Sequence, residues 1–200
     1  MKRRNLLSLA LALLTAIALS IAFAAVFSYY PVSITISPVS PPVYFEEGEN
    51  ANQDDLGANN TIAVNVGSSS TSVSITIHPT YQVTYYKNVT LIVNSDTSKA
   101  YNISLRVATP ANLSSGASAV VCVYSKGASR RLSGYPTPTP SGYVKNVSLT
   151  STGTTWIGYL SAGSAYEIDI YVYIPEGTRR PSSTTAELLL IASPSSESPP

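Results

Sequence analysis

Side chains able to do catalytic chemistry are few in this sequence. One histidine, His78, and one cysteine, Cys122, occur among its 200 residues. A zinc site needs several Cys or His ligands, and nucleophilic catalysis needs a nucleophile beside a base, but no such motif accompanies His78. His78 directly precedes Pro79 at the end of an alternating stretch, which favours an ordinary loop or edge residue. We therefore predict that the protein is not an enzyme and has no cofactor and no metal site.

Acidic residues offer two further possibilities. Glu167 and Asp169 have the i, i+2 spacing that places two carboxylates on one face of a strand, and glycosidases use two carboxylates. We expect a solvated outward face there instead. The stretch 46–55 holds five of the eleven acids, and calcium binds oxygen-rich loops. Its spacing matches no EF-hand, which favours a solvated acidic loop and leaves calcium open.

Cys122 lies in an apolar run, residues 119–123, which predicts a buried small hydrophobe. A lone cysteine excludes an intrachain disulfide, so the core, a partner or both must stabilise the fold.

The N-terminus has the pattern of a secretory signal peptide. Lys2, Arg3 and Arg4 precede an uncharged apolar run, residues 6–27, which contains the small-x-small site at residues 22–24. We predict a signal peptide over residues 1–24, cleaved after Ala24, and a secreted protein that meets the membrane only through this leader. An uncleaved anchor is the alternative. Without the leader the chain has nine basic and eleven acidic residues, so nucleic acid is not an expected partner.

Five N-x-[S/T] sequons lie in the part of the chain expected to be exported. In such a protein each is a candidate site for an N-linked glycan. The asparagines are Asn59, Asn88, Asn102, Asn112 and Asn146.

Beyond the leader, β-branched and aromatic residues recur with period two, and Gly, Pro, Ser and Asn clusters separate the runs, which predicts an all-β chain. We expect a two-sheet β-sandwich of jelly-roll or Greek-key type over residues 43–192 and a disordered tail over 193–200. Loops are expected at 46–60, 126–142 and 175–183. The predicted strands are 32–37, 61–66, 73–77, 89–94, 101–108, 119–124, 144–149, 155–160, 166–174 and 185–192.

The strand 166–174 illustrates how the two faces of a strand are expected to divide. One alternating set should be core and the other surface or interface. The core set is Tyr166, Ile168, Ile170, Val172 and Ile174, and the surface set is Glu167, Asp169, Tyr171 and Tyr173.

A short motif occurs twice, as V-S-I-T-I-S-P at 32–38 and V-S-I-T-I-H-P at 73–79. The first copy belongs to residues 25–42, which we interpret as an extended strand followed by a proline-rich linker. Such a tethered strand can fold back onto its own sheet or enter a neighbouring molecule as a donor strand. Its apolar face comprises Val26, Tyr30, Val32, Ile34 and Ile36.

The leader, this tethered strand, the Tyr-, Ser- and Thr-rich sandwich and the lack of disulfides resemble the archaeal bundling pilins, which are related to the TasA and camelysin family. The resemblance implies identical subunits that polymerise head to tail by donating the N-terminal strand and then associate laterally into bundles. It implies a role in cell adhesion or biofilm formation. The alternative function is that of a monomeric β-sandwich protein of the cell surface, free or membrane-anchored, which binds carbohydrate or has another cell-surface role.

Overall fold

The structure is a computed structural model that describes residues 2–22, 28–180 and 182–197. The chain divides into two units, residues 1–38 and 39–200. The first unit contains α1 (Lys2–Ala22), which covers most of the predicted signal peptide. The predicted cleavage site after Ala24 and the predicted donor residue Val26 lie outside the described residues. Within the described part of the chain, no helix combines the length and the apolar character needed to cross a membrane.

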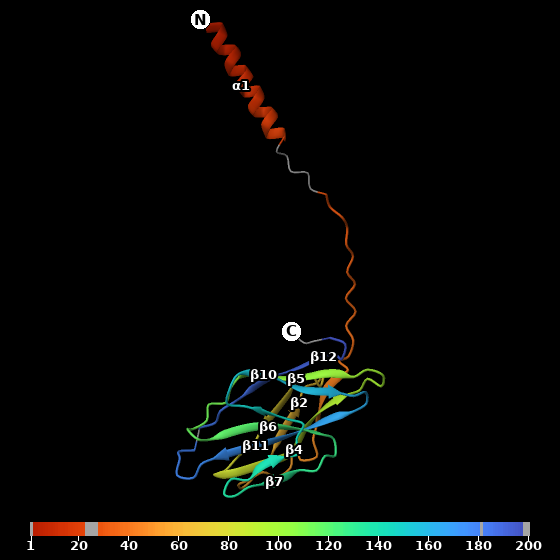
Figure 1. Cartoon of the computed structure of the whole chain (residues 1–200), viewed down its shortest axis with the longest axis vertical. Helices are drawn as coiled ribbons and strands as arrows, with labels where there is room; N and C mark the ends of the chain where they lie inside the picture. Colours follow the sequence, from red (N-terminus) through yellow and green to blue (C-terminus); the bar gives the residue numbers. More distant parts are fainter. Residues whose placement is uncertain (1, 23–27, 181, 198–200) are drawn as a thin grey trace. The chain divides into compact units, whose positions relative to one another are not determined.

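The second unit is built around a five-stranded antiparallel sheet (Figure 1). Its spatial order is β1 (Val43–Glu47), β4 (Gln82–Asn94), β11 (Ala165–Ile174), β6 (Ser118–Ser125) and β9 (Lys145–Ser148). The central strand β11 pairs with both β4 and β6, which are the long strands beside it.

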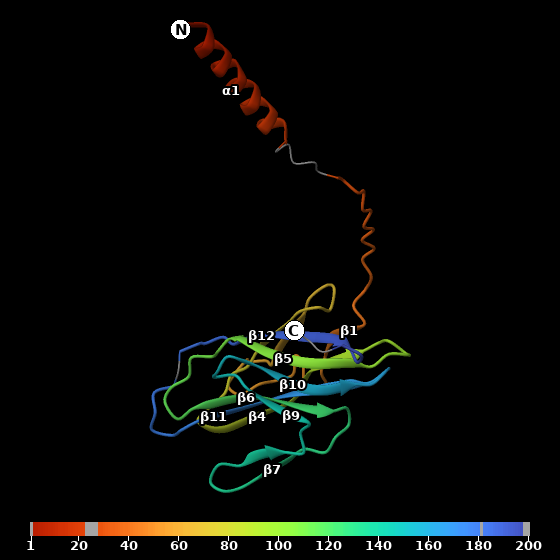
Figure 2. The ribbon, with the colours of Figure 1, turned by 45° about the horizontal axis from the view of Figure 1, so that its top comes forward.

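A smaller sheet lies against this one. It has the order β10 (Gly153–Leu160), β5 (Tyr101–Thr109) and β12 (Glu187–Pro194). Two hairpins complete the unit, β2 (Ala63–Val66) with β3 (Val73–Thr76) and β7 (Arg131–Ser133) with β8 (Thr139–Ser141). Figure 2 shows β10, β5 and β12 on one side of the five-stranded sheet and β7 on the other. The all-β, sandwich-like prediction is confirmed at this level, and the jelly-roll type stays a prediction.

The main core lies between the two sheets. Alternate residues of β5 (Ile103, Leu105 and Val107) are buried in one cluster with alternate residues of β11. The β11 members are those predicted from sequence: Tyr166, Ile168, Ile170, Val172 and Ile174. Period-two alternation therefore identified the inward face of the central strand correctly.

The other face of β11, predicted to be surface or interface, is instead buried within the fold. Glu167, Asp169 and Tyr171 are buried and Tyr173 is half-buried. The reason is a second buried cluster on the outer side of the five-stranded sheet, which contains Cys122 and packs against Ala128 and Tyr143 of the β6–β9 connection. A connection that covers the sheet removes solvent from a face that alternation alone would leave exposed.

Several element boundaries also differ from prediction. β4 begins at Gln82 rather than at residue 89. The sequence prediction missed its first half because the alternation changes phase near Asn88, where φ is 45° and the pairing with β11 shifts register. β1 lies partly inside the predicted 46–60 loop, and β7 and β8 lie inside the predicted 126–142 loop. The tail is ordered further than expected, since β12 runs to Pro194 and the Asn102 side chain donates to the Glu197 carbonyl at 2.7 Å.

Candidate functional site

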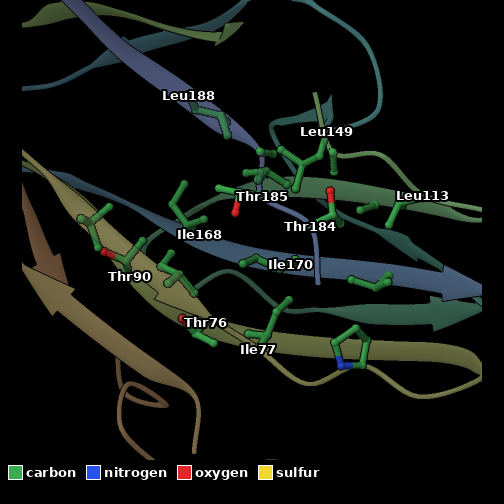
Figure 3. Close-up of a pocket in the computed structure, with 18 of the residues that line it drawn as sticks. Thr76, Ile77, Thr90, Leu113, Leu149, Ile168, Ile170, Thr184, Thr185 and Leu188 are labelled. Carbon is green, nitrogen blue, oxygen red and sulfur yellow. The ribbon is translucent and has the colours of Figure 1, made fainter. Parts of the chain in front are cut away.

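An apolar groove opens into the core between β3 and β12. Its volume is about 480 Å³. Its floor is the inner face of β11, and its two walls are formed by β3 and β12; in Figure 3, Ile168 and Ile170 lie between Leu188 on one side and Ile77 on the other. Among the described lining residues, Arg180 is the only charged one. The groove therefore suits the binding of an apolar surface and offers no set of groups for catalysis.

Both walls of the groove are strands with a free edge. Within the described residues, β3 pairs only with β2, and β12 pairs only with β5. Each outer edge carries backbone N–H and C=O groups that a further strand could bind. In the described part of the chain, the groove thus has an unpaired strand edge on each side, one from β12 of the smaller sheet and one from the β2–β3 hairpin.

The β11–β12 connection forms a polar rim beside the groove. Residues 182–185, with the sequence Ser-Ser-Thr-Thr, line it together with Ala186. The Thr184 hydroxyl accepts a hydrogen bond from the Asn112 backbone N–H at 2.9 Å. Sequence reasoning missed this rim, because it predicted a loop only to 183 and a strand from 185.

The predicted donor segment is extended and exposed. Residues 28–41 belong to no strand of the described structure. The side chains of Tyr30, Val32, Ile34 and Ile36 are 80–84% exposed, which is unusual for four apolar residues in alternation. The structure thus contains an exposed apolar strand sequence in its first unit and an apolar groove in its second.

On the outer side of the five-stranded sheet, Arg130 binds the two carboxylates that were expected to be solvated. Its Nε donates to Asp169 Oδ2 at 3.0 Å, and its Nη2 donates to Glu167. Asp169 also accepts from the Asn88 backbone N–H at 2.7 Å and from the Tyr85 hydroxyl. Burial and this contact with Asp169 raise the pKa of Tyr85 far above its usual value. Both carboxylates are therefore buried and bound by groups of the sandwich itself, which gives the pair a structural role in the fold.

The acidic loop is solvated only in part. Asp55 has a side chain only 1% exposed, and its carboxylate accepts from the backbone N–H of His78 at 2.7 Å. The Nδ1 of His78 lies 2.9 Å from the same carboxylate oxygen. Burial, and then the charge of Asp55, raise the pKa of the nearby Tyr86. His78 follows β3 at the edge of the sheet as predicted, and Asp55 ties the acidic loop to it.

The single cysteine is buried as predicted, with no exposed surface at Cys122. Burial raises the pKa of its thiol to about 12. Across residues 2–22, 28–180 and 182–197, no three His, Cys, Asp or Glu side chains gather in a way that could hold a metal ion.

The five sequons divide by burial. Asn59, Asn112 and Asn146 are exposed. Asn88 is 3% exposed and Asn102 is 7% exposed. The Asn102 Nδ2 already donates to the carbonyls of the C-terminal segment, so neither buried asparagine presents its amide for a glycan on the folded protein.

No protein-family model matches the chain, and no curated protein matches its sequence closely enough to count as a relative.

Proposed function

We propose that the protein is the structural subunit of an extracellular filament that polymerises by donor-strand complementation. The alternating segment 30–36 of one subunit fills the β3–β12 groove of the next. The observation that carries this proposal is the groove itself, an apolar channel with a free strand edge on each side in a chain that also exposes an unpaired apolar strand sequence.

The segment and the groove match in length and periodicity. The groove floor presents four alternate residues of β11, from Ile168 to Ile174. The donor face also has four alternate positions, from Tyr30 to Ile36. Each run covers six residue steps, or about 20 Å of strand. Four side chains buried at about 2 kcal/mol each would contribute up to about 8 kcal/mol before ordering costs, and main-chain hydrogen bonds add register.

Prolines delimit the donated segment. Pro31 and Pro38 have no backbone N–H, so neither can donate to a sheet ladder. The residues between them, 32–37, can pair on both edges. A strand bounded in this way has limited freedom to slide along the groove, which supports a defined repeat between subunits.

A second surface suits lateral association of filaments into bundles. On the outer face of the smaller sheet, Trp156 and Tyr159 are about half-exposed, and their ring centroids lie 5.5 Å apart in an edge-to-face arrangement. Leu189 of β12 is exposed on the same face, since it and Trp156 pair with Arg106 and Ser104 of β5. Exposed aromatic groups of this kind favour contacts between protein surfaces. Secretion, glycosylation and a role in adhesion or biofilm complete the proposal and rest on the leader, the exposed sequons and the pilin resemblance.

The test is a pair of neighbouring substitutions in the donor segment. Ile34→Asp places a charge on the face proposed to enter the groove, and the matched control Thr35→Asp places the same charge on the opposite face. Electron micrographs and sedimentation should show monomers for Ile34→Asp and filaments for Thr35→Asp. Circular dichroism should show a folded β-sandwich in both, because residues 28–41 belong to none of its strands. Filaments from Ile34→Asp would refute the proposal, and so would a wild-type protein that stays monomeric.

A further inference from the structure

β4 contributes Thr90 and Ile92 to the lining of the groove, so the first and last residues of β4 can name its two ends. We call them the Gln82 end and the Asn94 end. β11 runs from the Asn94 end to the Gln82 end, since Ala165 pairs with Val93 and Ile174 pairs with Gln82. The polarity of any strand beside the groove can be stated in these terms.

The strands β3 and β12 run in opposite directions along the groove. Before β3, Ser70 accepts a hydrogen bond from Phe45, which pairs with Ile92 near the Asn94 end. After β3, the chain reaches Gln82 within six residues. β3 therefore runs toward the Gln82 end.

β12 runs toward the Asn94 end. Its last residue, Pro194, pairs with Tyr101, two residues after Lys99, whose carbonyl accepts from the side chain of Asn94 at 2.8 Å. A strand placed between β3 and β12 is consequently parallel to one of them and antiparallel to the other.

The N-terminal segment joins the second unit at the Asn94 end. The Ser95 backbone N–H donates to the Pro42 carbonyl at 2.8 Å, and the next residue, Val43, pairs with Asn94. Two closed arrangements are conceivable: the segment folds into the groove of its own subunit, or two subunits exchange segments reciprocally at this end. In both, the inserted segment has Ser37 nearest the Asn94 end. That strand would be antiparallel to β3.

Head-to-tail stacking reverses this polarity. The Asn94 end of one subunit then meets the Gln82 end of the next, and the donated segment enters with Ser37 nearest the Gln82 end. The donated strand is then parallel to β3 and antiparallel to β12. Only this open arrangement continues into a filament, because reciprocal exchange closes as a dimer.

We propose that in the filament the V-S-I-T-I at 32–36 lies parallel to and in register with the V-S-I-T-I at 73–77 of the acceptor subunit. This inference rests on the proposed function and adds the partner strand, its polarity and its register. Val73, Ile75 and Ile77 line the groove. An in-register parallel neighbour sets each apolar donor residue beside its identical counterpart, as in stacked in-register strands.

The flanking prolines favour this register over a shift by two residues. Pro38 follows the first copy at the same spacing as Pro79 follows the second. In register, the two prolines reach the same level, so both strands lose their N–H donors together and the pairing ends cleanly. In this arrangement the two copies of the motif are adjacent strands of one sheet, which gives a physical reason for their similarity.

Paired cysteines test the polarity and register. Ser33 and Thr35 are exposed on the donor, and Ser74 and Thr76 are exposed on β3. The matched variants are S33C/S74C and T35C/T76C, and the crossed variants are S33C/T76C and T35C/S74C. All four contain the same two strands and number of new thiols. The native Cys122 has no exposed surface, so it stays outside the reaction in the folded protein.

After assembly and mild oxidation, the matched variants should give ladders of covalent multimers on a denaturing gel, and the crossed variants should give monomers. A mixture of the single variants S33C and S74C should give covalent dimers, which shows that the bond joins different chains. Filaments in which the crossed variants cross-link, or in which none does, would overturn this register while leaving the proposed function intact. If neither the wild type nor any of the variants forms filaments, both the register and the proposed function are overturned.

Discussion

The Arg130 guanidinium lies 3.0 Å from the carboxylate of Asp169, whose side chain has no exposed surface. The same guanidinium binds Glu167, donates to the Ala128 carbonyl at 2.7 Å and stacks 4.7 Å from the centre of the Tyr124 ring. One arginine thus holds the β6–β9 connection over the outer face of the five-stranded sheet while it compensates two buried charges.

Removal of this arginine should strongly destabilise the sandwich. Arg130→Met keeps much of the side-chain volume but leaves Glu167 and Asp169 buried without a cation. Because an uncompensated buried charge is costly, we expect the free energy of unfolding to fall by about 3–5 kcal/mol. Urea unfolding followed by tryptophan fluorescence measures this change, since Trp156 is the single tryptophan.

The neighbouring Arg131→Met is the matched control. Arg131 is exposed, and its removal should change stability by about 0.5 kcal/mol or less. Equal losses from the two variants would show that the β7–β8 hairpin, rather than the buried ion pair, determines the stability of this face.

Arg130 also illustrates what alternation in the sequence can and cannot predict. The inward set of β11 was predicted residue by residue, because a strand in a two-layer fold has one face toward the core. The burial of Glu167 and Asp169 depends on a connection about forty residues earlier in the chain. Two adjacent arginines in a proline-rich loop were the one available signal, and nothing local shows which face that loop covers.

If Trp156 and Tyr159 mediate bundling as proposed, their removal should affect bundling but not polymerisation. Trp156→Ala with Tyr159→Ala should leave single filaments intact, because both side chains lie on the face away from the groove, while side-by-side association should decrease. Negative-stain images scored for bundle width measure this. The control Thr154→Ala changes an exposed position on the same strand without an aromatic group. Bundles of unchanged width in the double variant would show that another face mediates lateral contact.

Two sequons of opposite burial should respond differently to substitution. On the proposed glycosylation of exposed sequons, Asn146→Gln should remove one glycan, seen as a loss of mass, with little effect on stability because Asn146 is exposed. Asn102→Gln should leave the glycan mass unchanged but lower the free energy of unfolding by about 1–3 kcal/mol, because buried hydrogen bonds to the C-terminal segment are disturbed. Loss of a glycan from the Asn102 variant would contradict the structure of this edge.

The groove lay beyond sequence reasoning for a related reason. The segment proposed as donor could be singled out from the sequence, since its apolar alternation and its prolines are local features. The groove proposed as its acceptor is formed by β3, β11 and β12, which are distant in sequence, and the free edges of β3 and β12 follow only from the order of strands in space. Pairing order is a property of the whole fold, and the period of a strand is the same whether its edge is paired or free.

Asp96 predicts a specific loss of stability in acid. Its carboxylate accepts hydrogen bonds from the backbone N–H groups of Ser98 and Lys99, at 2.8 and 3.0 Å, and from the hydroxyls of Ser98 and Tyr101. These bonds, led by the Ser98 backbone N–H, lower its pKa from 3.8 to about 2.

A carboxyl group whose pKa is lower in the folded state adds stability that is complete above its unfolded pKa, and this contribution is lost as the pH falls toward its folded pKa. As the pH is lowered from about 4 to about 2, the urea concentration at the unfolding midpoint should therefore decrease more steeply for the wild type than for Asp96→Asn. The exposed Asp54→Asn should retain the wild-type slope, and identical slopes for the wild type and Asp96→Asn would exclude Asp96 as the source of the acid sensitivity.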